Sequence, residues 1–249
     1  MRNIKLTLEY DGTRYLGWQR PGKKDNSKTL SCKITDTLGR VLNEHPTLYC
    51  AARTEPGVHA SCQTVNFQTN SLLSPVRIRQ ELNHYLPQDI AVLTAEEVPG
   101  RFHASLRLHS LTYAAFLHTG SSLDVFYRKY QLHHPAPLDL SAMRKAAEML
   151  PGVHDFHCFS SGKTKKGTEK NIFDIQLCTP AADKLQIHLT GNSFLQQMPG
   201  LLLGTLLEIG EERRTPECIP SILSGKEHPG HPIPSHSIHL LHTNYEALP

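Results

Sequence analysis

Apolar and polar residues alternate in three short segments of the first hundred residues. These segments cover residues 4–10, 63–67 and 90–95, and a period of two predicts β-strands. Residues 30–42 instead carry apolar side chains at helical spacing, and residues 76–86 follow a proline of the kind that starts helices. The first hundred residues are therefore expected to mix strands and helices.

The rest of the chain repeats this order of elements. Such a pattern predicts an α+β fold that consists of two related α/β halves. We place the N-terminal half at residues 1–105 and the C-terminal half at residues 106–249. The remaining predicted elements are strands over 48–52, 111–118, 172–178, 185–189 and 238–245 and helices over 140–150 and 201–209.

Composition changes this picture little. Of the 249 residues, 39% are hydrophobic and 20% are charged, which is typical of a globular protein with a substantial core. No apolar run is long enough to cross a bilayer, and the first ten residues alternate where a signal peptide would be apolar, so we expect a cytoplasmic protein without a membrane partner. The six cysteines are dispersed along the chain and are expected to be reduced thiols.

The charge is weakly basic, with a formal net value of +3. This balance permits an acidic partner such as RNA but does not require one, and solvated loop side chains explain the basic residues equally well. The basic residues that could contact phosphates form two clusters, Arg14, Arg20, Lys23 and Lys24 near the N-terminus and Lys163, Lys165 and Lys166 in the C-terminal half.

Sequence motifs narrow the interpretation. The informative segments are YDGTRYLGWQR at residues 10–20, AARTEPGVHA at 51–60, LNHYLPQDIAV at 82–92, GRFHA at 100–104, HDFHCFSS at 154–161 and FLQQMPGLLLGTLLEIG at 194–210. They extend over nearly the whole chain, and in their order and spacing they resemble the motifs of the TruA-type tRNA pseudouridine synthases.

The resemblance implies a pseudouridine synthase fold, in which the sheets of two related α/β halves join across a central RNA-binding cleft. The N-terminal half would carry the catalytic loop at residues 51–60, and the C-terminal half would complete the cleft and provide a dimer interface. Known members of this branch are homodimers that modify uridines in the anticodon arm of tRNA without a cofactor. They break the glycosidic bond of a flipped-out uridine, rotate the base and reattach it through carbon, using one essential aspartate.

The resemblance also assigns roles to single residues. Arg53 would contact the flipped nucleotide, and Tyr113 would stack on its base. Glu55 stands where the family has its catalytic aspartate, and Gly200 stands where the family has the arginine that pairs with that aspartate. An added methylene moves the carboxylate oxygens by about 1 Å, which can cost about a hundredfold in rate. Because Pro199 lacks a backbone N–H, we expect the helix to start there.

Three functions fit these substitutions. The first is an RNA-binding member of the family, for tRNA or ribosomal RNA, whose isomerase activity is lost or severely reduced. The second is an active synthase in which Glu55 is the catalytic carboxylate and another cation, such as Arg53, holds it. The third is a protein-interaction subunit that no longer binds RNA. A mixed dimer with an intact paralogue that supplies the missing aspartate also stays open.

Other residues have simpler interpretations. Tyr15 and Trp18 could form a stacking surface for bases, although packing into the core is the more common role of such residues. His59 is expected to be a hydrogen-bonded structural residue. Because alternate positions along the predicted last strand face opposite ways, we expect no metal site from the histidines at 228, 231, 236, 239 and 242.

Overall fold

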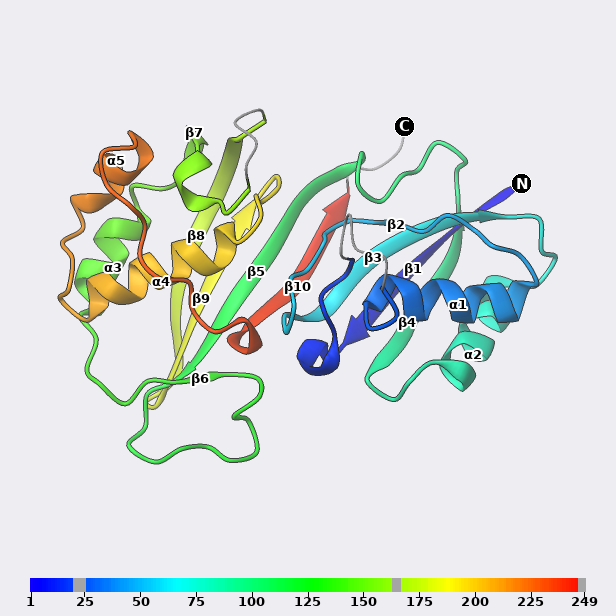
Figure 1. Cartoon of the computed structure of the whole chain (residues 1–249), viewed down its shortest axis with the longest axis horizontal. Coiled ribbons are helices and arrows are strands. Elements are labelled where there is room, and N and C mark those ends of the chain that lie inside the picture. The colour runs from blue at the N-terminus through cyan, green and yellow to red at the C-terminus, as the bar shows by residue number, and fades with distance from the viewer. Residues whose placement is uncertain (20–25, 163–166, 246–249) are drawn as a thin grey trace. The chain divides into compact units, whose positions relative to one another are not determined.

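A computed structural model describes residues 1–19, 26–162 and 167–245. The chain divides into two compact units. Unit 1 holds residues 1–109 together with the strand that returns at Leu240, and unit 2 holds Ser110–His239. Each unit combines a sheet with helices (Figure 1), so the α+β class predicted from the sequence is confirmed.

The sheet of unit 1 has the strand order β4-β1-β3-β10, and β2 pairs with β3. Strand β1 is antiparallel to both β3 and β4. The strands are β1 (Arg2–Tyr10), β2 (Tyr49–Cys50), β3 (His59–Thr69), β4 (Ile90–Val98) and β10 (Ile238–Tyr245). The strand predicted over residues 48–52 is thus reduced to two residues, because only Tyr49 and Cys50 pair with β3.

Two helices belong to unit 1, and each has a clear start signal. In α1 (Leu30–Leu42) the hydroxyl of Thr29 accepts a hydrogen bond from the backbone N–H of Cys32 at 3.4 Å, and α2 (Pro75–Tyr85) is capped by Ser74. Helix α1 packs against α2, which packs against β4 (Figure 1). The face of α1 that is buried consists of Leu30, Ile34, Leu38 and Leu42, spaced at four residues as predicted.

The sheet of unit 2 has the order β5-β9-β8-β7 with antiparallel pairing, and β6 runs parallel to β5. Its strands are β5 (Leu108–His118), which begins two residues before the unit boundary, β6 (Leu132–His133), β7 (Gly152–Asp155), β8 (Glu169–Ala181) and β9 (Lys184–Gly191).

Helix α4 (Met198–Gly210) is the central helix of unit 2, and nearly all its residues are buried. It starts at Met198 with Pro199 in its first turn, as the missing N–H of proline predicts. Helix α3 (Leu140–Ala147) packs on α4 and on β8, while α5 (Cys218–Leu223) contacts the short 3-10 helix η2 (His157–Phe159). Two further 3-10 helices are η1 (Gly12–Arg14) and η3 (Ser235–Ser237).

Across the described ranges 1–19, 26–162 and 167–245, no helix combines the length and the apolar character needed to cross a bilayer. All six cysteines are free thiols, as expected from their dispersion along the sequence.

Candidate functional site

The loop that carries Arg53 and Glu55 lies between β2 and β3 and is held by buried polar contacts. The Tyr10 hydroxyl lies 2.7 Å from Thr54 Oγ1. The side-chain amide of Gln63 bridges the base of the loop, because its Nε2 donates to the Ala52 carbonyl at 2.7 Å and its Oε1 accepts from the Ala52 N–H at 3.2 Å. Burial raises the pKa of the Tyr10 phenol above its usual range, so the hydroxyl stays protonated. These contacts fix the loop to β1 and β3.

A second loop, residues 11–19, lies directly against the first. The Trp18 N–H donates to the Thr54 carbonyl at 2.8 Å, and a Cβ at Gly17 would lie 2.8 Å from that same oxygen. Gly17 has a φ of +82°, a conformation that glycine adopts without strain. Trp18 is only 2% exposed, so it packs in the core and offers no stacking face for a base.

His59 is a buried part of the same contact. Its Nδ1 accepts a hydrogen bond from the Gly12 N–H at 3.1 Å and lies 3.2 Å from the Asp11 carboxylate. A Cβ at Gly12 would lie 2.0 Å from the Val58 carbonyl oxygen, so the two loops meet there at backbone level. This environment agrees with the structural role expected for His59.

Glu55 is half-buried, and its backbone carbonyl accepts the Val58 N–H at 3.1 Å across a turn that contains Gly57 at φ +81°. Arg53 is exposed two residues earlier. With the Gln19 side-chain oxygen facing Arg53, that oxygen accepts from Nε at 3.1 Å and from Nη1 at 3.3 Å. Gln19 is a residue that the sequence interpretation did not single out, although it lies within the matching segment at residues 10–20.

Arg14 is the member of the N-terminal basic cluster that lies within the described residues, and it is paired with an acid. Its Nε donates to the Asp89 carboxylate at 2.8 Å, while its side chain stays 72% exposed. The hydroxyl of the buried Tyr15 donates to the same carboxylate at 2.5 Å, so this polar group has a partner. The other predicted RNA contacts, Arg20, Lys23, Lys24, Lys163, Lys165 and Lys166, lie outside the described residues.

Two further predicted site positions belong to unit 2. Tyr113 lies on β5 opposite Leu189 of β9, is 6% exposed, and meets the ring of Phe194 edge-on with 5.4 Å between centroids. Gly200 lies in the first turn of α4, and its carbonyl accepts the Ile233 N–H at 3.2 Å. A Cβ there would lie 3.4 Å from Pro232, an ordinary contact, so the position has room for a small side chain.

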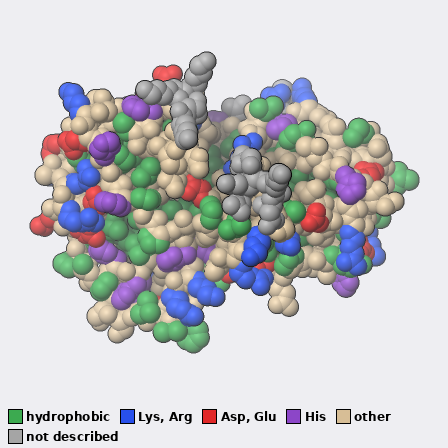
Figure 2. All heavy atoms as spheres, viewed as in Figure 1, with side chains coloured by type: hydrophobic (Ala, Val, Ile, Leu, Met, Phe, Trp, Pro, Cys, Tyr) green, Lys and Arg blue, Asp and Glu red, His purple; other side chains and the backbone are tan. Residues whose placement is uncertain are grey.

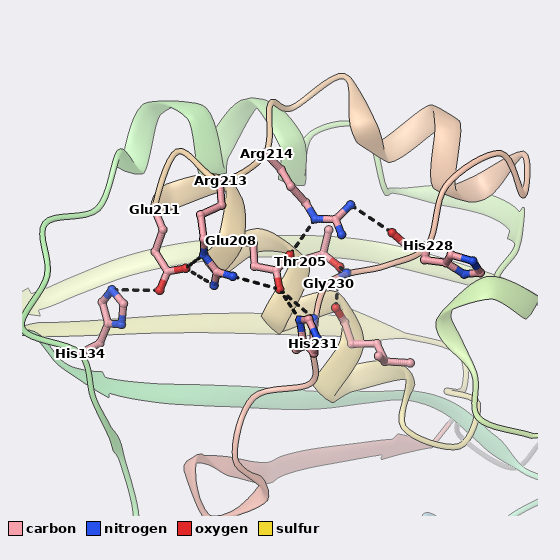
Figure 3. Close-up of polar contacts among 10 residues, drawn as sticks. His134, Thr205, Glu208, Glu211, Arg213, Arg214, His228, Gly230 and His231 are labelled. Atoms are coloured by element: carbon pink, nitrogen blue, oxygen red, sulfur yellow. Dashed lines mark hydrogen bonds and ion pairs between the residues drawn. The ribbon is translucent and has the colours of Figure 1, made fainter.

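Helix α4 also carries the buried carboxylate of Glu208, which the sequence analysis did not single out. Glu208 is 4% exposed and faces Arg214, Arg213 and His231 (Figure 3). Arg214 Nε donates to Oε2 at 2.7 Å, Arg213 Nη1 lies 3.5 Å from Oε1, and the His231 backbone N–H donates to Oε1 at 2.9 Å. Nearby, the Gly230 N–H donates to Thr205 Oγ1 at 2.8 Å. The segment before β10 is thereby fixed to α4.

The charge state of Glu208 follows from these contacts. Burial acts to raise the pKa of the carboxyl, but the hydrogen bonds from the His231 backbone, Arg214 and the His231 side chain, with the charge of Arg213, outweigh it and lower the pKa to about 2. Glu208 is therefore ionised throughout the physiological range.

Two of the histidines near the C-terminus contact other side chains or the backbone. His231 contacts Glu208, and His239 Nε2 lies 3.0 Å from the Tyr130 carbonyl, with its ring on Phe116. Within residues 1–19, 26–162 and 167–245, no group of three or more His, Cys, Asp or Glu side chains is arranged to hold a metal ion.

Comparison with known families gives one clear match. The model of the tRNA pseudouridine synthase family matches residues 7–105 and 146–246, which together make up more than half of the chain. Both loops of unit 1 and helix α4 lie within the matched residues.

Curated relatives match over almost their full length. The chain is 36% identical over 228 residues to tRNA pseudouridine synthase A 2 of Bacillus anthracis, covering 91% of this chain and 92% of that protein. It is 37% identical over 227 residues to tRNA pseudouridine synthase A 2 of Clostridium tetani, covering 91% of each. Among solved structures, an archaeal box H/ACA sRNP Nop10–Cbf5 complex aligns at 10% identity and a TM-score of 0.36, over 82% of this chain and 44% of that chain, a likeness too distant to carry an argument.

Proposed function

Because the chain belongs to the tRNA pseudouridine synthase family, we propose that it binds folded RNA, with tRNA as the first partner and ribosomal RNA as a second, and that it acts as a homodimer. Its conversion of uridine to pseudouridine is lost or strongly reduced. The observation that carries this proposal is the pair of residues Glu55 and Gly200, which stand where the family's motifs have an aspartate and its arginine partner.

The loop architecture supports RNA binding. Buried contacts of Tyr10, Thr54 and Gln63 anchor the loop of Arg53 to β1 and β3, and Arg53 is exposed. A guanidinium held by Gln19 has fewer conformations to lose when it meets a phosphate, so less conformational entropy opposes binding. A contact of this kind positions RNA without reading its sequence.

The surface charge predicts binding of moderate strength that depends on salt. Figure 2 shows Lys and Arg side chains interspersed with acidic and histidine side chains on the face in view. RNA contacts would then come from a few individual Lys and Arg side chains and not from a continuous basic surface. Each phosphate neutralised adds to the salt dependence of the affinity.

The substitutions support impaired catalysis. Glutamate is one methylene longer than aspartate, and a displacement of about 1 Å of a reacting atom can cost about a hundredfold in rate. Glycine at position 200 has no charged side chain, so the cation that the family motif has at this position is missing from this sequence.

An active synthase that uses Glu55 is the second candidate. It is favoured by the position of Arg53, which lies on the same loop two residues before Glu55 and is exposed. In that case Arg53 would take over the role of the missing helix arginine. A subunit that binds proteins and no RNA is the third candidate.

The deciding experiment incubates the full-length protein with tRNA and ribosomal RNA transcripts labelled with tritium at uridine C5. Tritium release and mass spectrometry report pseudouridine, and filter binding reports affinity. We expect RNA binding and no product above background. Product that disappears in Glu55→Ala would establish the active synthase, and no RNA binding at any salt concentration would leave only the protein-interaction subunit.

Three variants sharpen this test. Glu55→Ala is expected to leave RNA affinity unchanged, and Glu9→Ala, at an exposed acid on β1, is the matched control. The double variant Glu55→Asp with Gly200→Arg restores both residues of the family motif and is expected to gain isomerase activity. If the double variant folds, binds tRNA and still makes no product, these two substitutions do not account for the missing activity. Native mass spectrometry of the same samples tests the homodimer.

A further inference from the structure

A cysteine, a histidine and an aspartate form a chain of contacts in unit 2, within the segment at residues 154–161. Cys158 Sγ lies 3.1 Å from His157 Nε2. The other ring nitrogen of His157, Nδ1, lies 3.3 Å from Asp155 Oδ2. The His157 backbone N–H also donates to Asp155 Oδ1 at 3.0 Å, so the carboxylate meets both the backbone and the ring of the same residue.

The fold holds these three residues in place. Asp155 ends β7, where it pairs with Glu169 of β8, and His157 and Cys158 lie on the 3-10 helix η2. On either side, Phe156 and Phe159 are fully buried and fix this short helix. The two side chains nearest solvent, His157 and Asp155, are 41% and 52% exposed, so a small solute can reach the cluster.

The protonation states suit transfer of the thiol proton to the imidazole. Burial, with the nearby charge of Asp155, raises the pKa of the Cys158 thiol, so the thiol is protonated at rest and needs a base in order to react. A hydrogen bond from Thr168 holds the pKa of the Asp155 carboxyl below its usual range, so that carboxyl is ionised. An ionised carboxylate favours the tautomer with hydrogen on Nδ1, which leaves the Nε2 lone pair facing the thiol.

This order of groups, nucleophile to base to orienting carboxylate, activates cysteine and serine nucleophiles in general. We propose that Cys158 is a thiol-modification site with His157 as its base and Asp155 as the residue that orients the base, and that its reactant is a low-molecular-weight disulfide. The product is a mixed disulfide on the intact protein.

The reaction is balanced without a further oxidant. His157 Nε2 takes the thiol proton as Cys158 Sγ attacks one sulfur of the small disulfide. A new S–S bond forms to Cys158, the S–S bond of the reactant breaks, and the second sulfur leaves as a thiolate that takes up the proton. The small disulfide is reduced to one free thiol for each protein sulfur oxidised.

The other cysteines provide internal references. Cys178 is exposed on β8, so accessibility alone favours its reaction over that of the half-buried Cys158. Cys218 is buried and reports loss of the fold if it becomes modified. Cys32 and Cys62 lie near a carboxylate and a hydroxyl group, at 3.4 Å and 3.8 Å, neither of which is a base of the imidazole type.

The test treats the reduced full-length protein with oxidised glutathione and follows the adduct at each cysteine by peptide mass spectrometry. We expect Cys158 to react about ten- to a hundredfold faster than Cys178. A positioned general base accelerates a reaction by about a hundredfold or more, so this expected ratio of rates is a modest one.

Two variants distinguish assistance by the His157 base from the effect of solvent accessibility on the rate at Cys158. His157→Asn is expected to bring the rate at Cys158 down to or below that of Cys178, and Asp155→Asn to lower it by a smaller factor. His154→Asn, the same substitution on β7, is the matched control and should leave the rate unchanged.

The proposal is overturned if Cys178 reacts as fast as Cys158 in the unmodified sequence, or if His157→Asn leaves the rate at Cys158 and the protection of Cys218 unchanged. Should His157→Asn expose Cys218, Asp155→Asn decides: an unchanged rate at Cys158 in that variant, with Cys218 still protected, overturns the role of His157 as an oriented base. None of these outcomes depends on RNA binding or on isomerase activity.

Discussion

The hydroxyl of Tyr10, the last residue of β1, lies 2.7 Å from the hydroxyl of Thr54. Thr54 directly precedes Glu55 in the sequence. Gln63 of β3 reaches the same phenol oxygen, with Nε2 at 3.4 Å. One buried oxygen therefore links two strands to the candidate catalytic loop.

Tyr10→Phe is expected to lower the free energy of unfolding by about 1–3 kcal/mol, because the buried groups of Thr54 and Gln63 lose a partner. Urea unfolding measures the loss. Tyr49→Phe, at a half-exposed tyrosine of β2, is the control and should change the free energy by less than about 0.5 kcal/mol. Equal effects of the two substitutions would show that the Tyr10 contact adds nothing.

Arg53→Ala is expected to weaken tRNA binding and to reduce the slope of log affinity against log salt by about one, the signature of one lost phosphate contact. Gln19→Leu should weaken binding in the same direction by a smaller factor, since it frees the guanidinium without removing it. Filter binding over a series of salt concentrations measures both. Arg77→Ala on α2, where the arginine pairs with Glu81, is the matched control. An unchanged slope in Arg53→Ala would place Arg53 outside the RNA contact.

Two glycines of α4 should respond oppositely to alanine. A Cβ at Gly204 would lie 1.7 Å from the His231 carbonyl oxygen, whereas a Cβ at Gly200 meets only ordinary contacts. Gly204→Ala is expected to destabilise unit 2 by about 3 kcal/mol or more, through overpacking. Gly200→Ala should be neutral or stabilise it by up to about 1 kcal/mol, because alanine favours helix. Thermal melting compares the pair, and similar melting temperatures would contradict the close crossing of the segment before β10 over α4.

The lowered pKa of Glu208 makes the free energy of unfolding depend on pH. Its pKa is about 2 in the folded chain and about 4.3 in an unfolded chain, so its contribution is fully present above pH 5 and is lost as pH falls toward 2. The contribution is roughly 3 kcal/mol, since each pH unit between the two values is worth about 1.4 kcal/mol.

Glu208→Gln should remove this part of the acid dependence, whereas Glu148→Gln, at an exposed acid after α3, should leave it in place. Urea unfolding at a series of pH values between 3 and 7 measures the difference. Parallel pH profiles of the two variants would contradict the assignment to Glu208.

Much of the fold could be predicted from local pattern. Helix α1 has the predicted bounds, residues 30–42, because apolar residues recur every four positions after a capping threonine. Strand β10 also matches its predicted range of 238–245. Long elements with one buried face repeat their signal many times, so a short stretch of sequence is enough to identify them.

The elements that were missed are short or irregular. Strand β6 has only two residues, and α5 has six residues with Pro220 inside it, so neither repeats a periodic signal often enough to be recognised. In the site, the motifs located Arg53 and Glu55, but not the contact of Gln19 with Arg53 or of Tyr10 with Thr54. Those contacts join residues 34 and 44 positions apart, and local pattern carries no information about such pairings.

Unit 1 is assembled from both ends of the sequence. Thr243 Oγ1 on β10 lies 2.8 Å from Thr64 Oγ1, and the Tyr245 hydroxyl donates to the Ala104 carbonyl at 2.9 Å. During synthesis on the ribosome, β3 must therefore wait for some 170 further residues before its neighbour β10 emerges. Until then the nascent chain presents an open sheet edge, the kind of edge that chaperones shield and that invites mispairing. Folding of unit 1 is therefore completed only after β10 has been synthesised, although most of its strands are synthesised much earlier.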